Sequence, residues 1–217
     1  CTMPTLVLMR HGEAGFAARD RARPLTPRGR EEAASQARAI RRVVGDIDVA
    51  IVSEATRTRQ TLAALRSAGL AVARVREEAS LYSRGGEGLL EALRGMGRGE
   101  IESAAPGADG AWQADVTRES LDAREAYGAE SGAGADAVLV VGHEPTMSTL
   151  AGLLASREKD PPETRNRARF RALRGPGAAR ADSFRHGFST AMAVVGHVES
   201  WSSLAPGRMQ IVDVLRA

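Results

Sequence analysis

The sequence predicts an α/β protein, a three-layer α/β/α sandwich built on a mostly parallel but mixed sheet of about six strands. Short continuous apolar runs, as expected of strands buried on both faces, alternate with segments of helical apolar spacing. The last two strand patterns are joined by a short connection, which suits an antiparallel pair. At 217 residues, 43% of them hydrophobic and 26% charged, the chain fits one globular domain, 1–217.

The first half of the chain contains three strand patterns, each followed by a helix pattern. The clearest helix start is Thr26-Pro27, because threonine suits the N-cap and proline the first helical position, and Gly45 ends the same segment. The expected strands are 5–9, 48–52 and 71–75, and the expected helices are 27–44, 57–65 and 87–93.

The second half contains three further strands and one helix, separated by two long insertions. Pro145 opens the helix, and its apolar face consists of Met147, Leu150, Ala151 and Leu154. The expected strands are 136–141, 190–198 and 208–215. The insertions, at about 95–135 and 157–186, are longer than ordinary connections, so each is expected to be a lid or a mobile loop, with a helix over 118–127 in the first.

The composition excludes several kinds of site. Cys1 is the only cysteine, so neither a disulfide framework nor a thiolate zinc site is expected. No His/Asp/Glu cluster has metal-ligand spacing, and we expect neither a metal nor another cofactor. The apolar runs are too short to span a membrane and no signal peptide is recognisable, so we interpret residues 1–3 as a processing or cloning remnant and the protein as cytoplasmic.

The net charge of +3 comes mostly from one segment. Between Arg157 and Arg185 there are nine basic and four acidic residues, which leaves the rest of the chain at −2. This segment could dock an acidic or phosphorylated partner, or simply be a solubilising insertion. The segment contains no aromatic residues besides Phe170 and Phe184 on which bases could stack, and this disfavours nucleic-acid binding.

The tripeptide Arg10-His11-Gly12 directly follows the first expected strand, at the position where open α/β sheets bind ligands. A neutral histidine can act as a nucleophile near neutral pH, and arginine offers a planar fork of donors to phosphate oxygens. Glycine lets the backbone turn closely around an anion. Alone, the tripeptide is a weak signal, since a histidine at a strand end is more often structural.

Two further sites follow the second strand and the strand 136–141. Ser53 lies at a strand end, and Arg57 lies in the first turn of the next helix, where a basic side chain needs some favourable partner such as a phosphate. His143, in the sequence Gly-His-Glu-Pro before a helix, can donate to a phosphoryl oxygen. Because the strands end at one edge of the sheet, we expect His11, Arg10, Arg57 and His143 to meet around one phosphate.

Together, these motifs resemble those of the histidine phosphatase superfamily, which has the phosphoglycerate-mutase-like fold. The resemblance covers about two thirds of the chain. The matching stretches are Leu8-Met9-Arg10-His11-Gly12-Glu13, Arg23 to Gly29, the signature Ser53…Arg57…Gln60-Thr61, and Val141 to Pro145. Leu81-Tyr82 and the stretches Phe188 to Thr190 and Leu204 to Gly207 are most similar to phosphohistidine phosphatases of the SixA type.

The resemblance implies a metal-independent phosphatase that works through a phosphohistidine on the enzyme. His11 would be the nucleophile, and Arg10, Arg57 and His143 would hold the phosphoryl group. Further substrate contacts are expected from Gly12, Glu13, Arg23, Ser53, Glu144 and Thr190. The expected substrate is phosphohistidine in a protein, inorganic phosphate is the product, and no membrane partner is expected.

One departure from the family pattern bears on the substrate. Many members carry a glutamate, as general acid, at the position that Ser83 occupies here; Glu13, Glu78 and Glu87 are alternatives among which the sequence does not choose. General acids typically contribute about two to four orders of magnitude in rate. Because the P–N bond of phosphohistidine is already labile, the missing glutamate favours phosphohistidine over phosphate esters.

Other functions remain open. The substrate could be a small phosphomonoester such as a sugar phosphate or a nucleotide, whereas a mutase would need an acid and a second set of phosphate contacts that are not evident. From another class, the domain could be an inactive module that binds phosphoproteins. The arginine-rich segment leaves nucleic-acid binding as the weakest alternative.

Overall fold

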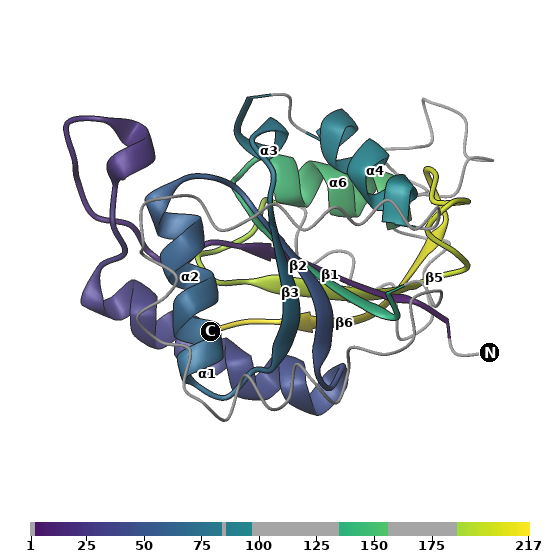
Figure 1. The fold of residues 1–217 in the computed structure, drawn as a ribbon, viewed down its shortest axis with the longest axis horizontal. Coiled ribbons are helices and arrows are strands. Elements are labelled where there is room, and N and C mark those ends of the chain that lie inside the picture. The colour runs from purple at the N-terminus through teal and green to yellow at the C-terminus, as the bar shows by residue number, and fades with distance from the viewer. Residues whose placement is uncertain (1–2, 84–85, 97–134, 156–185) are drawn as a thin grey trace.

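The computed structural model describes residues 3–83, 86–96, 135–155 and 186–217, which are built around a six-stranded sheet (Figure 1). The strands are β1 (Thr5–Arg10), β2 (Ile47–Val52), β3 (Val72–Glu77), β4 (Ala137–Gly142), β5 (Ala193–Val198) and β6 (Met209–Leu215). Their order is β3-β2-β4-β1-β5-β6. Neighbours from β3 to β1 are parallel, whereas β5 is antiparallel to both β1 and β6. The predicted fold class, with a mixed sheet, is confirmed.

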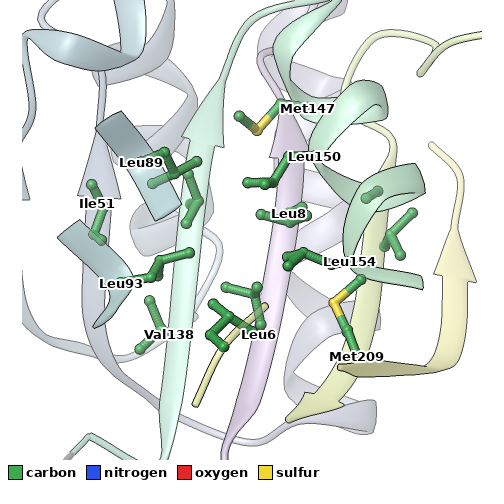
Figure 2. Packing of buried hydrophobic residues seen from close by; sticks show 14 of the residues in the cluster. Leu6, Leu8, Ile51, Leu89, Leu93, Val138, Met147, Leu150, Leu154 and Met209 are labelled. Atoms are coloured by element: carbon green, nitrogen blue, oxygen red, sulfur yellow. The ribbon is translucent and has the colours of Figure 1, made fainter. Parts of the chain in front are cut away.

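Helices cover both faces of this sheet, which gives the three layers. The main helices are α1 (Pro27–Val43), α2 (Thr56–Ser67), α4 (Gly86–Gly95) and α6 (Thr146–Ala155). Leu6 and Leu8 of β1 point towards α6, where they pack with Leu150 and Leu154 (Figure 2). The alternate residues of β1 lie on the other face, in a second cluster with Ile40 of α1 and residues of α2. The central strands are therefore apolar on both sides, as their continuous apolar runs predict.

The predicted elements are all present where the chain is described, with differences at three places. A 3₁₀ turn, η1 (Asp20–Ala22), and the one-turn helix α3 (Ser80–Ser83) were not predicted, because elements this short carry no periodicity. The strand expected from Thr190 begins only at Ala193. Its first residues instead form a turn in which Ala191 has a φ of 55°, in the left-handed region that a strand cannot include.

Nearly all of both insertions, and the helix expected over 118–127, lie outside the described residues. Within the part that is described, no helix is both long and apolar enough to cross a membrane. The strands of all the described segments belong to one sheet, but the assignment of 1–217 to one domain stays a prediction.

A close contact between two glycines joins the loop after β1 to the start of α1. A Cβ added to Gly12 would overlap the carbonyl oxygen of Gly29, and a Cβ added to Gly29 would overlap that of Glu13. The N-cap residue Thr26 strengthens this contact, because its Oγ1 accepts from the Gly29 amide at 3.0 Å and donates to Glu13 Oε1 at 2.8 Å. The loop that carries His11 is therefore held against the first turn of α1.

We expect Gly29→Ala to lower the free energy of unfolding by about 2–3 kcal/mol, because the new methyl group would displace backbone rather than a flexible side chain. The matched control is Gly152→Ala in α6, where nothing lies within 4 Å of the added Cβ. Alanine should stabilise that helix by up to about 1 kcal/mol. Urea unfolding followed by circular dichroism measures both changes. An unchanged midpoint for Gly29→Ala would contradict this account of the contact.

Candidate active site

Side chains from the carboxyl ends of three strands meet at one edge of the sheet. His11 follows β1, Ser53 and Arg57 follow β2, and His143 follows β4. The centroids of the two imidazole rings are 5.3 Å apart, and Arg57 Nε donates to His11 Nε2 at 3.2 Å. The structure thus brings His11, Arg57 and His143 together at this edge.

His11 is held in one tautomer by its own loop. Its Nδ1 donates to the carbonyl oxygen of Gly12 at 2.7 Å, so Nε2 carries the lone pair and accepts from Arg57. The residue is 9% exposed. Burial, together with the nearby arginines, lowers the pKa of His11 to about 4, although the bond to Gly12 opposes this. At neutral pH the ring is therefore uncharged, with the lone pair on Nε2.

His143 is held by Ser53, which is fully buried at the end of β2. The His143 Nε2 and the Ser53 Oγ are hydrogen-bonded at 2.8 Å, whereas Nδ1 is buried without a hydrogen-bond partner among the described residues. Burial and the positive charge of Arg57 lower the pKa of His143 to about 3. Both imidazoles are thus neutral near pH 7, so the positive charge of the site resides on arginine.

Arg10 is the last residue of β1 and contributes a guanidinium to the same edge. Its Nη1 donates to the carbonyl oxygen of Phe188 at 2.5 Å, and its Nε is buried without a partner in the described part of the chain. The charge of Arg10 helps to lower the pKa of His11. A buried N–H that lacks an acceptor is costly, so this donor would be stabilised by an anion beside His11.

Arg57 makes its strongest contacts with a residue that sequence analysis did not single out. Its Nη1 donates to the backbone oxygen of Asp20 at 2.7 Å, and its Nη2 to Asp20 Oδ2 at 2.9 Å. Arg57 is 6% exposed, whereas the Asp20 side chain, on the turn η1, is 50% exposed. No motif marks Asp20, which lies in a loop among several charged residues.

Tyr82 of α3 completes this group of side chains. Its hydroxyl donates to Asp20 Oδ2 at 2.7 Å, and its ring lies edge-on to that of His143, with centroids 5.4 Å apart. The guanidinium of Arg21 lies over the Tyr82 ring, 4.7 Å from its centroid. The hydrogen bonds from Tyr82 and Arg57 hold the pKa of Asp20 well below its usual range, and the Asp20 carboxylate raises the pKa of Tyr82. Sequence analysis noted Tyr82 only as part of a family resemblance.

Arg23 and Glu13, both expected to contact substrate, have structural partners. Arg23 donates from Nε to the Gly15 oxygen at 2.8 Å and from Nη1 to Asp20 Oδ1 at 3.3 Å. Its charge also helps to lower the pKa of His11. Glu13 instead accepts from Thr26 at the start of α1. A role in substrate binding stays a prediction for both residues.

The remaining expected contacts lie around the same edge. The Gly12 amide donates to Thr61 Oγ1 at 3.1 Å, which already satisfies the donor. Glu144 accepts from the Ser148 hydroxyl at 2.6 Å in the first turns of α6. Thr190 is half-buried in the turn before β5, and no hydrogen bond among the described residues joins it to His11, Arg10, Arg57 or His143.

The structure does not select a general acid from the positions considered. Glu78 pairs with Arg76 at 3.1 Å, and Glu13 is bound to Thr26. Glu87 is exposed in the first turn of α4, and the side chain of Ser83 is outside what the structure describes. Over the described residues, no group of three or more His, Cys, Asp or Glu side chains could hold a metal ion.

A hollow of about 590 Å³ lies beside these side chains, in the loop that follows His11. Its lining residues are Ala14, Gly15, Phe16, Ala17, Ala18, Asp20 and Arg23. The Phe16 side chain in this loop is 92% exposed. Because Asp20 also contacts Arg57, the hollow adjoins the His11–Arg57–His143 group.

Comparison with known proteins gives a consistent result. A family model described as histidine phosphatase superfamily (branch 1) matches residues 6–168. No curated protein has a significant match to the sequence. Among solved structures, a protein provisionally named phosphohistidine phosphatase SixA, from Nakamurella multipartitia, is 29% identical; the alignment covers 100% of this chain and 97% of that one, with a TM-score of 0.66.

Two other solved structures share the fold at lower identity. A protein from Agrobacterium tumefaciens, with the same provisional name, is 20% identical, with coverage of 98% of each chain and a TM-score of 0.58. The protein histidine phosphatase SixA, solved with tungstate, is 19% identical over 98% of this chain and 96% of that one, also with a TM-score of 0.58.

Proposed function

This chain belongs to the histidine phosphatase superfamily, and we propose that it removes a phosphoryl group in two steps, through a phosphohistidine formed on His11. The observation that carries the proposal is the arrangement around the His11 ring. Nδ1 is bound to a carbonyl, Nε2 has the lone pair and accepts from Arg57, and the centroid of the His143 ring lies 5.3 Å from that of His11. Membership of a phosphatase family favours catalysis over an inactive phosphoprotein-binding module.

In the first step, His11 Nε2 attacks phosphorus in line with the leaving group. A P–N bond to His11 forms while the bond to the leaving atom breaks, and that atom keeps the electron pair and takes a proton from water. The imidazole becomes positively charged, and the Gly12 carbonyl that accepts from Nδ1 stabilises this charge. Arg10 and Arg57 offset the negative charge of the phosphoryl oxygens.

In the second step, water attacks the phosphohistidine on the face that the leaving group has vacated. The P–N bond breaks, its electron pair returns to His11 Nε2, and the proton lost by the water passes to solvent. His143 is neutral near pH 7 because of its lowered pKa, so it stabilises the phosphoryl group as a hydrogen-bond donor rather than as a cation. Inorganic phosphate is released.

We further propose that the substrate is phosphohistidine in a protein. Two observations support this choice over small phosphate esters. Among the described residues, the carboxylate that contacts Arg57 is that of Asp20, and its pKa is held well below its usual range, so it would not donate a proton to an alkoxide leaving group. The hollow, which is lined by small residues together with Phe16, Asp20 and Arg23, also offers room for a group larger than phosphate.

A comparison of substrates tests this choice. We expect kcat/KM for a phosphohistidine peptide to exceed that for a phosphoserine peptide of the same sequence, and for sugar phosphates, by at least about 100-fold, because esters need the missing acid. His11→Ala measures the spontaneous loss of phosphohistidine and is subtracted. Equal or greater turnover of any ester would assign the enzyme to small or ester substrates instead.

The titration of the two imidazoles should reflect their burial. We expect ring proton chemical shifts to give midpoints at about pH 4 for His11 and about pH 3 for His143. His11→Asn and His143→Asn assign the signals. Since histidines of the unfolded chain titrate near pH 6.5, the unfolded state binds more protons below that pH, and the folded state should lose stability as the pH falls from about 6.5 towards 4. A midpoint near 6.5 for either ring would contradict the conclusion that burial and the nearby arginines lower its pKa.

A further inference from the structure

The Asp20 carboxylate accepts hydrogen bonds from donors that would also suit the oxygens of a phosphoryl group. Three donors converge on its carboxylate: Tyr82 OH at 2.7 Å and Arg57 Nη2 at 2.9 Å on Oδ2, and Arg23 Nη1 at 3.3 Å on Oδ1. A carboxylate oxygen and a phosphoryl oxygen accept the same kinds of hydrogen bond, and arginine pairs with both. The group therefore has the features of an oxyanion site that the chain fills with its own carboxylate.

We propose that Asp20 takes the place of a phosphoryl oxygen in the free protein, and that Tyr82 is a further donor to the phosphoryl group once Asp20 has left. The proposal rests on the proposed function only in that Arg57 binds the phosphoryl group. It assigns two new roles: Asp20 is an internal competitor of the substrate anion, and the Tyr82 hydroxyl is a phosphate ligand.

The burial of the partners shows which of them can move. The Asp20 side chain is 50% exposed and lies on the short turn η1, so its carboxylate can rotate into water and be solvated there. Arg57 is nearly buried in the first turn of α2, where it also contacts His11. An entering anion would therefore displace the aspartate and leave the arginine in place.

Arg57 is fully engaged in the free protein. Its Nε is bound to the lone pair of His11 Nε2, and Nη1 and Nη2 are both bound to Asp20. The donors of the guanidinium are thus paired with acceptors on His11 and Asp20, and the lone pair of His11 Nε2 is occupied. Release of the Asp20 carboxylate would free Arg57 Nη2 for a phosphate oxygen while Nη1 keeps the Asp20 backbone oxygen, and Arg57 could then release the His11 lone pair for attack.

Tyr82 is placed to follow the same exchange. Its ring contacts that of His143, and its hydroxyl points to the oxygen that Arg57 also binds. After the carboxylate leaves, the hydroxyl has a free hydrogen to donate beside Arg57. A tyrosine hydroxyl ordinarily titrates near pH 10, so it keeps this hydrogen at neutral pH. Tyr82 directly precedes Ser83, the position where the family glutamate is missing.

A different role for Asp20 predicts the opposite result. If Asp20 only positions Arg57 and remains bound to it during turnover, its removal should weaken the binding of an anion. If it competes, its removal should strengthen that binding. The sign of one measured change therefore separates the two roles.

The test measures the Kd of inorganic phosphate by isothermal titration calorimetry, at neutral pH and fixed ionic strength. We expect Asp20→Asn and Asp20→Ala to lower the Kd about 10-fold, and Tyr82→Phe to raise it about fivefold, the usual effect of one hydrogen bond to a charged acceptor. The control is Glu54→Gln, which removes one negative charge just after β2. Glu54 pairs with Arg21, which lies next to Asp20 on η1. It should change the Kd by less than about twofold.

Each outcome decides the proposal. If the Kd of phosphate were higher or unchanged in both Asp20 variants, or if they bound no measurable phosphate, competition by Asp20 would be overturned. If the Kd were unchanged in Tyr82→Phe, the role of Tyr82 as a phosphate ligand would be overturned. If Glu54→Gln lowered the Kd as much as the Asp20 variants do, the effect would have to be attributed to the loss of negative charge or to greater mobility of η1, and not to the Asp20 contact. Because phosphate binding needs no turnover, the proposed function could fail, with no phosphoenzyme on His11, while this result holds.

Discussion

Replacing His11 with alanine should abolish turnover, with kcat at least about 10⁴-fold lower, while the fold is retained. The size of the effect follows from loss of the proposed nucleophile itself. The fold should persist because the described hydrogen bonds of the His11 ring are to a loop carbonyl and to Arg57, and the ring is no part of the two apolar clusters.

Two measurements check this result. Turnover of a phosphohistidine peptide gives the rate, and rapid quenching with radiolabelled substrate should trap an acid-labile label in the wild type that maps to the peptide containing His11. The matched control is His197→Ala, because His197 pairs with Thr5 at the opposite end of β1 and bonds to its hydroxyl at 3.1 Å. Near-full activity of His11→Ala, or a label on another residue, would refute the assignment of the nucleophile.

Arg57→Ala should lower kcat/KM by about 10³-fold, the second largest effect. Loss of an electrostatic donor from a buried catalytic site typically costs about 10²–10³ in rate, and Arg57 is the most buried arginine at this site. Arg57→Lys keeps the charge but loses the planar fork, so we expect it to recover only part of the activity.

The control for this change lies on the same helix. Arg59→Ala removes an arginine of α2 that is paired with Glu77, at 2.6 Å, on the side of β3. It should leave kcat/KM within about threefold of the wild type, since exposed or half-exposed ion pairs contribute little. If Arg57→Ala and Arg59→Ala gave equal losses, the effect of Arg57 would have to be attributed to the helix and not to the phosphoryl group.

The sequence was sufficient for the fold because each main element has a local signal. The strands buried on both faces read as continuous apolar runs, and α1 is bounded by Thr26-Pro27 and Gly45. Where the backbone departs from such signals, prediction was wrong: β5 starts three residues late because Ala191 adopts a left-handed conformation that alanine rarely takes.

The site was predictable to the extent that it follows strand ends. His11, Ser53 and His143 directly follow strands, so topology alone brings them together. Asp20 and Tyr82 reach the site from a 3₁₀ turn and a single helical turn, whose positions depend on tertiary contacts. No spacing in the sequence could therefore have placed the Asp20 carboxylate on Arg57.

The position of β1 in the sheet affects how the protein folds. Although it is the first strand, it lies inside the sheet, and both its neighbours come much later: Thr5 is in register with Ala137 on one side and with His197 on the other. Such high contact order slows folding, since long loops must close before any pairing is rewarded. During synthesis on the ribosome, His11 would be made well before β4 and β5, so the chemistry proposed for it could begin only after both of these strands had emerged.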